Sequence, residues 1–251
     1  MIVMGRDIIK KNMKQNMKND LMKKLKLFWK GWGYSIFVAV IIASSFKSAI
    51  ADWNIVPTGS MKPTIVEGDR IFINKLAYDL KIPYTTWHIA EWRAPQRGDI
   101  VVFYSPADGR RLVKRVVGIP GDLVEMQNDQ LIINGKHITY ESCESVDNIG
   151  DNGPSRGRTG DNYRFTENLN GVKHPIMIIP MRPALRSFGP VVVPKGKFFM
   201  MGDNRDNSAD SRYFGFVERN RIVGQALSIV ASFDINHNYH PRWERFFTKL
   251  P

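Results

Sequence analysis

A run of 16 residues without a charged side chain, GWGYSIFVAVIIASSF at positions 31–46, constrains this chain more than any other feature of its sequence. As a helix the run is about 24 Å long, against about 30 Å for the hydrocarbon core of a bilayer. Residues 27–29 and 48–51 lengthen it at both ends, and the interrupting Lys30 and Lys47 can reach the lipid headgroups with their ammonium groups. We therefore predict one transmembrane helix at residues 28–51.

Basic residues are concentrated ahead of this run. Residues 1–30 hold nine Lys and Arg and two Asp, so this segment contributes +7 to a total net charge of +12. Positive charge is retained on the cytoplasmic side of a membrane. The sequence thus predicts a basic cytoplasmic tail at residues 1–27 and a main body outside the cytoplasm. A nucleic-acid-binding function is disfavoured, because most of the excess charge precedes the apolar run.

Two other interpretations of the apolar run remain open. A cleaved signal peptide has the same order of charges, and Ala49-Ile50-Ala51 matches a small-x-small cleavage site. A helix buried in a protein core also fits the modest length. The long basic segment favours an uncleaved anchor, because the charged region of a signal peptide is usually shorter.

Beyond residue 53 the chain changes to short runs of β-branched and aromatic residues, separated by turn pairs such as Gly68-Asp69 and Asn134-Gly135. This pattern predicts an all-β domain of mainly antiparallel sheets. A glycine-rich segment at 141–190 interrupts the rhythm, and we interpret it as an inserted extension. The main domain is then formed by residues 52–140 and 191–251. The predicted strands cover residues 70–75, 99–104, 111–119, 123–126, 131–133, 197–201 and 222–231.

Cysteine and histidine exclude several classes of site. Cys143 is the single cysteine, which excludes an intramolecular disulfide and a cysteine-based zinc cluster. The five histidines show no spacing typical of metal ligands. We therefore expect no metal and no other cofactor.

Two segments could carry catalytic chemistry. Ser60 lies in PTGSMKPT at 57–64, where a loop can present its hydroxyl beside backbone N–H groups, although an ordinary turn explains these residues as well. Lys114 lies in a predicted strand and shares a face with Leu112 and Val116. Apolar neighbours would lower its pKa and let it act as a general base, whereas a lysine on an edge strand would keep a solvated ammonium group.

A third segment, GDNRDNSADSRYFGFV at 202–217, packs acids, arginines, asparagines and serines into one loop. Short polar residues at this density form hydrogen bonds to the backbone and predict a rigid loop. The acid spacing does not match an EF-hand, and the two arginines disfavour a bound cation.

With RGDIVV at 97–102, these segments resemble the signature boxes of bacterial type I signal peptidases, which are membrane-bound serine proteases with a Ser/Lys dyad. The resemblance extends from about residue 53 to residue 224. It implies a fold of two antiparallel sheets and an endopeptidase that cleaves N-terminal signal peptides from exported preproteins through an acyl-enzyme. The implied cleavage sites are small-x-small sequences such as Ala-x-Ala.

The resemblance also assigns roles to individual residues. Ser60 is the implied nucleophile and Lys114 the general base. The hydroxyl of Thr58 and the backbone N–H of Ser60 form the implied oxyanion hole, and Ser208 orients the lysine. The implied structural residues near the site are Asp203, Asp210 and Arg212, and the implied pocket residues are Val56, Met61, Leu112 and Val113.

The implied location is the bacterial inner membrane, crossed once, with a cytoplasmic N-terminus and the catalytic domain on the outer, periplasmic face. The expected partners are secretory preproteins and membrane lipid, with no nucleic acid, and the expected state is a monomer. Two features depart from the family pattern. Many relatives have two membrane spans, whereas this sequence has one apolar run. Several relatives have a disulfide in the extension, which this chain cannot form because Cys143 is its single cysteine.

Two other functions fit parts of the sequence. A self-cleaving protease related to the SOS-response repressors shares the dyad, but it would need DNA-binding helices where this chain has an apolar run. An inactive scaffold is disfavoured because Ser60, Lys114 and Ser208 are all present.

Overall fold

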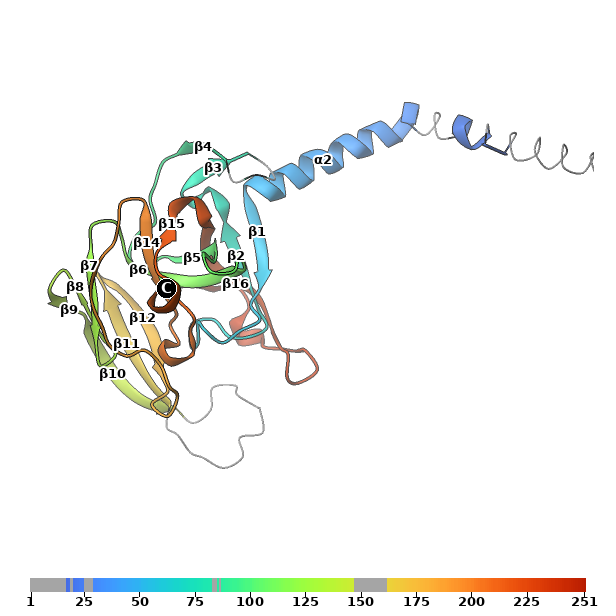
Figure 1. Ribbon diagram of the computed structural model, residues 1–251. Coiled ribbons are helices and arrows are strands. Elements are labelled where there is room, and N and C mark those ends of the chain that lie inside the picture. Colours follow the sequence, from blue (N-terminus) through green and yellow to red (C-terminus); the bar gives the residue numbers. More distant parts are fainter. Residues whose placement is uncertain (1–16, 19, 25–28, 83–84, 86, 147–161) are drawn as a thin grey trace, which may run out of the picture. The chain divides into compact units, whose positions relative to one another are not determined.

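The computed structural model describes residues 17–18, 20–24, 29–82, 85, 87–146 and 162–251 (Figure 1). The chain divides into two compact units, residues 1–48 and 49–251. Most of the predicted cytoplasmic tail and residue 28 of the predicted membrane span lie outside the described residues.

The first unit contains a short π-helix, η1 (Trp29–Gly33), followed by α2 (Tyr34–Ala49). α2 has 16 residues, and its apolar side chains include the exposed Ile36, Val40 and Ile42. In the described parts of the chain, no helix combines the length and the apolar character needed to cross a membrane.

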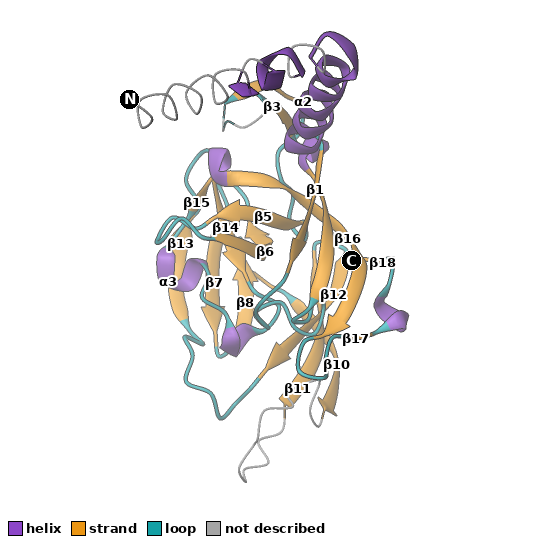
Figure 2. Cartoon of the chain, turned by 90° about the vertical axis from the view of Figure 1, so that its right-hand side faces the viewer, coloured by secondary structure: helices purple, strands orange, loops and turns teal. Residues whose placement is uncertain are grey.

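The second unit is built around a nine-stranded sheet with the order β1-β2-β16-β5-β6-β14-β15, and β17 and β18 also pair with β16 (Figure 2). β16 is the longest of these strands and pairs with both β2 and β5. The strands are β1 (Ala51–Ile55), β2 (Asp69–Asn74), β5 (Ile100–Tyr104), β6 (Arg111–Gly118), β14 (Lys197–Met201), β15 (Val217–Glu218), β16 (Ile222–Asp234), β17 (His240–Pro241) and β18 (Thr248–Lys249).

Three smaller sheets complete the unit. Their orders are β13-β7-β8-β9, β10-β11-β12 and β3-β4. Wherever the structure describes two paired strands, the pairing is antiparallel, which confirms the prediction of mainly antiparallel sheets for the domain that follows the apolar run. The strands are β3 (Asp79–Lys81), β4 (His88–Glu91), β7 (Leu123–Gln127), β8 (Gln130–Ile133), β9 (Lys136–His137), β10 (Thr139–Val146), β11 (Asn162–Leu169), β12 (Val172–Ile178) and β13 (Phe188–Val192).

Short helical turns connect several strands. Asn74 caps the first of them, because its side-chain oxygen accepts a hydrogen bond from the N–H of Leu76. Asp210 caps α3 in the same way through the N–H of Arg212. The turns are η2 (Lys75–Ala77), η3 (Arg205–Asn207), α3 (Ser211–Phe214), η4 (Arg219–Arg221) and η5 (Trp243–Arg245).

The strand β6 contributes to all three apolar clusters of the core. Val113 packs against one cluster, Val117 belongs to a second, and Val116 belongs to a third, against which Leu112 also packs. Because side chains alternate between the two faces of a strand, Lys114 lies on the same face as Leu112 and Val116. A lysine on β6 is therefore enclosed by the core.

Candidate active site

Ser60 and Lys114 are in direct contact although 54 residues separate them in the sequence. The Nζ atom of Lys114 donates a hydrogen bond to the Oγ atom of Ser60 at 2.6 Å and another to the carbonyl oxygen of Val113 at 3.0 Å. Ser60 lies in the loop between β1 and β2, and Lys114 lies in the middle of β6. The site thus joins a hydroxyl on a loop to an amine on a core strand.

Burial gives Lys114 an unusual acidity. Only 2% of the residue is exposed, and Val101 faces it from the neighbouring strand β5. Burial lowers the pKa of Lys114 to about 8, against the opposing effect of the Asp210 and Asp203 carboxylates. A substantial fraction of this amine is therefore neutral slightly above neutral pH, and a neutral amine can accept a proton.

Asn204 holds the serine loop in place. Its backbone N–H donates to the carbonyl oxygen of Ser60 at 3.1 Å, and its side-chain Nδ2 donates to the carbonyl oxygen of Gly59 at 3.0 Å. The contact requires glycine at 202, because a Cβ atom there would overlap the carbonyl oxygen of Ser60. The sequence places Asn204 within the 202–217 segment but assigns it no role.

Two hydrogen-bond donors beside Ser60 have no acceptor. Across the described ranges, neither the backbone N–H of Ser60 nor the hydroxyl of Thr58 donates a hydrogen bond. Thr58 is exposed. Both groups are therefore available to a negatively charged oxygen that develops near the serine.

A buried ion pair holds the residue next to Asn204 in place. Arg115 donates to both carboxylate oxygens of Asp203, at 2.9 and 2.8 Å, and each residue is 1% exposed. The hydroxyl of Thr64 also donates to Asp203. Burial raises the pKa of Asp203, but the Arg115 guanidinium outweighs this effect and holds that pKa below its usual range. Asp203 is thus an ionised anchor adjacent to Asn204.

Asp210 and Arg212 form a second ion pair. Arg212 donates to both oxygens of Asp210, at 2.9 and 2.8 Å, and both side chains are completely buried. Asp210 also accepts a hydrogen bond from the N–H of Gly202 at 3.1 Å. The pair therefore fixes the glycine on which the serine loop rests.

Ser208 lies close to Gly202, on which the serine loop rests, but its hydroxyl makes no hydrogen bond there within the described residues. The residue is 7% exposed, and a Cβ atom built on Gly202 would overlap its hydroxyl. The Ser208 hydroxyl has no hydrogen-bond partner among the described residues, Lys114 included.

The four residues expected to line a substrate pocket divide into two groups. Val56 and Met61 belong to one apolar cluster, and Val113 packs against it. Leu112 packs against a different cluster, because it occupies the opposite face of β6. The structure thus brings three of the four together in one cluster, and one of them, Met61, directly follows Ser60 in the sequence.

A buried polar network has no counterpart among the features predicted from the sequence. Arg205 donates to Glu167 at 2.5 Å, and the Nε2 atom of His174 lies 3.2 Å from the same carboxylate. All three residues are at most 1% exposed. The network connects β11 and β12 of the extension to the 202–217 segment. A hydrophobic pattern carries no signal for such a cluster, because its members are polar residues in strands and turns.

The sequence of this chain is similar to those of known proteins. The family described as "Signal peptidase, peptidase S26" matches residues 29–231. A signal peptidase I from Buchnera aphidicola is 32% identical, covering 88% of this chain and 80% of its own length. One from Pseudomonas fluorescens is 36% identical, covering 80% and 72%. A crystal structure of a signal peptidase I from Enterococcus faecalis is 31% identical with a TM-score of 0.31, covering 53% of this chain and 97% of the other.

Proposed function

We propose how this chain, which belongs to the signal peptidase family, peptidase S26, and is a hydrolase acting on signal peptides, carries out its reaction. It cuts exported preproteins after small-x-small sites such as Ala-x-Ala. Ser60 is the nucleophile and Lys114 is the general base. The observation that carries the proposal is the 2.6 Å contact between the two side chains. The pKa of about 8 for Lys114 supports it, because only the neutral amine can act as a base.

The proposed reaction proceeds through an acyl-enzyme. Neutral Lys114 takes the proton of the Ser60 hydroxyl while Oγ bonds to the scissile carbonyl carbon. The N–H of Ser60 and the hydroxyl of Thr58 donate to the oxyanion that forms. When the C–N bond breaks, the Lys114 ammonium group returns its proton to the leaving amine. Lys114 then activates a water molecule, which hydrolyses the ester and frees Ser60.

The remaining predicted residues act on this dyad indirectly in the proposal. Ser208 has a buried, unpartnered hydroxyl near Gly202 within the described part of the chain, and we assign it to orienting the Lys114 amine during proton transfer. Asp203, Asp210 and Arg212 hold the loop that carries these groups. Val56, Met61 and Val113 are assigned to the shallow apolar pockets that accept the small residues of the substrate, whereas Leu112, the fourth residue expected there, packs against a different cluster.

We further propose residues 28–51 as a membrane anchor, with residues 1–27 in the cytoplasm. The catalytic domain, residues 52–140 and 191–251 with the extension 141–190, then lies on the outer face of the bacterial inner membrane. There a monomer meets preproteins at the lipid surface. The basic tail and the uncharged run of 16 residues support this topology.

A reporter protein fused after residue 251 tests the topology. We expect its signal to come from outside the cytoplasm, and a cytoplasmic signal would contradict the proposed orientation.

The test of the activity uses the full chain in detergent and a preprotein with an Ala-x-Ala site. Wild type should release the mature protein, whereas Ser60→Ala and Lys114→Ala variants with unchanged circular dichroism should not. The cut position, read by mass spectrometry, should follow the second alanine. Cleavage by the Ser60→Ala variant at the same position would refute the proposed nucleophile.

We expect a Thr58→Ala variant to lose catalytic rate rather than substrate binding. Its hydroxyl acts on an oxyanion that exists only after attack, so kcat should fall by about 10²–10³ with KM nearly unchanged. Steady-state kinetics on a fluorogenic signal-peptide substrate measure both constants. Thr58→Ser keeps the hydroxyl and is the matched control, with kcat close to wild type. An unchanged kcat for Thr58→Ala would remove this residue from the mechanism.

The pH dependence of the reaction should report the lysine. Below a pKa of about 8 the Lys114 amine is protonated and cannot accept the Ser60 proton. We therefore expect kcat/KM to rise with pH and to reach half of its maximum near pH 8, with a loss of about tenfold per unit well below that value. A pH–rate profile from about pH 5 to about pH 10 tests this. A flat profile through this range would contradict the assignment of the base.

A further inference from the structure

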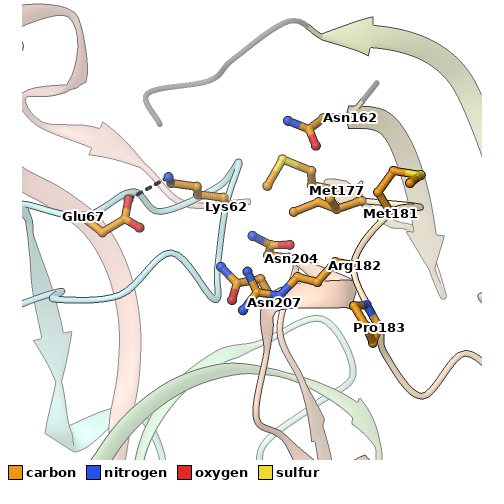
Figure 3. Close-up of a pocket in the computed structure, with 10 residues that line it drawn as sticks. Lys62, Glu67, Asn162, Met177, Met181, Arg182, Pro183, Asn204 and Asn207 are labelled. Atoms are coloured by element: carbon orange, nitrogen blue, oxygen red, sulfur yellow. Dashed lines mark ion pairs between the residues drawn. The ribbon is translucent and has the colours of Figure 1, made fainter. Parts of the chain in front are cut away.

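A cavity of about 380 Å³ opens beside the serine loop, and its lining shares no residue with the apolar cluster of the expected pocket. Lys62 and Glu67 line one wall, Met177 and Arg182 line another, and Asn204 and Asn207 lie between them (Figure 3). The apolar pocket, by contrast, uses the cluster of Val56, Met61 and Val113. The cavity and this cluster therefore both adjoin the segment that contains Ser60 and share no residue.

The cavity wall is continuous with the nucleophile. Lys62 follows Ser60 by two residues and forms an ion pair with Glu67 at 2.9 Å. The pair packs on the residue before the serine, because a Cβ atom on Gly59 would overlap Glu67 Oε1 and would lie 3.1 Å from Lys62 Cε. Asn204, which holds the carbonyl groups of Gly59 and Ser60, also lines the cavity.

Asn204 presents an unsatisfied acceptor at this cavity. The residue is 1% exposed, and its Oδ1 atom has no hydrogen-bond donor within the described residues. The orientation of its amide is fixed, because Nδ2 donates to the Gly59 carbonyl oxygen. A buried carbonyl oxygen without a donor is costly, and a backbone N–H of a bound peptide would satisfy it. The acceptor is therefore compatible with a peptide backbone as the occupant.

The charges of the lining favour an acidic occupant. Glu67 neutralises Lys62, whereas Arg182 is exposed and makes no ion pair in the parts that the structure describes. The cavity thus carries an uncompensated positive charge on a wall formed by Met177, Ile179 and Arg182. A carboxylate side chain would gain from this guanidinium, and a lysine or arginine would be repelled.

We propose that this cavity binds the first residues of the mature chain, after the scissile bond, and that Arg182 gives it a preference for an acidic side chain there. The inference rests on the proposed function, because a peptide spanning Ser60 with its signal-peptide residues in the apolar pocket must continue beyond the serine. Asn204 Oδ1 accepts a backbone N–H of that segment. Arg182 is a specificity residue and takes no part in bond breaking.

The charge preference is tested with preprotein peptides that share one signal sequence and carry Glu, Gln or Lys at the first, second or third mature residue. For the full chain in detergent, we expect one position at which Glu exceeds Lys in kcat/KM by about twofold to fivefold, the size of effect that an exposed ion pair gives. Arg182→Glu should abolish or reverse this order, with the kcat/KM of each peptide expressed relative to that of the Gln peptide for the same variant. Lys195→Glu, an equal change of charge in the turn before β14, should leave the order unchanged.

The acceptor is tested with a second set of peptides, in which single backbone amides after the scissile bond are replaced by esters. Loss of one N–H should lower kcat/KM about threefold to tenfold at a single position and leave the other positions unchanged. Equal cleavage of the Glu, Gln and Lys peptides by an active wild type, or an order that Arg182→Glu does not alter, would overturn the charge preference. An active enzyme indifferent to every ester would overturn the role of Asn204. If wild type cleaves none of the peptides, the proposed function itself fails.

Discussion

Replacing Lys114 by methionine will lower kcat/KM by about 10⁴-fold or more, the size of loss seen when a catalytic dyad or triad loses a member. The reason is chemical, because a thioether side chain has no atom able to take the proton of Ser60. Methionine fills nearly the same volume as lysine, and the site on β6 is already enclosed by apolar residues. The variant therefore keeps the core and removes only the base.

The stability of the same variant separates chemistry from folding. Burial disfavours the charged form of Lys114, so an uncharged side chain should leave the unfolding midpoint equal to or above that of wild type near neutral pH. A Lys114→Arg variant is the second control, since a guanidinium stays protonated and should be equally inactive. Cleavage by folded Lys114→Met at more than about a hundredth of the wild-type rate would exclude this residue as the base.

Five strands of the main sheet, β2, β5, β6, β14 and β16, could be predicted because their residues follow a simple physical rule. Runs of β-branched and aromatic residues bounded by turn residues predicted segments such as 197–201 and 111–119, and the structure has β14 at Lys197–Met201 and β6 at Arg111–Gly118. The alternation of β6 also placed Lys114 on the face of Leu112 and Val116, where the core encloses it. Local pattern sufficed for β6 and β14 because each of these strands is mostly buried.

Other parts depend on contacts between distant residues and have no local signal. The hydrogen bond from Asn204 Nδ2 to the carbonyl oxygen of Gly59 joins positions 145 residues apart. The pairing of Arg205 with Glu167 likewise exists only once β11 has docked against the 202–217 segment. The separation of Leu112 from the other pocket residues follows from the face that it occupies, which the resemblance alone did not reveal.

Breaking the buried ion pair between Arg115 and Asp203 is expected to have a large effect on stability. An Asp203→Ala substitution should lower the free energy of unfolding by about 3–5 kcal/mol, because it leaves the Arg115 guanidinium buried without its counterion. For a domain of this size, the melting temperature should then fall by roughly 6–20 °C. Thermal unfolding of the full chain in detergent, followed by circular dichroism, measures this shift.

Two control variants test whether the unpaired buried charge causes the loss of stability in Asp203→Ala. Glu141→Ala breaks an ion pair with Lys173 in which both side chains are about half exposed, and such pairs contribute about 0–1 kcal/mol, so this variant should melt close to wild type. The double variant Arg115→Met with Asp203→Leu removes both charges and should recover much of the loss, since no unpaired charge stays buried. A melting temperature within about 2 °C of wild type for Asp203→Ala would mean that the pair contributes little. Equal losses in the single and double variants would instead assign the effect to lost packing and to the hydrogen bond from Thr64.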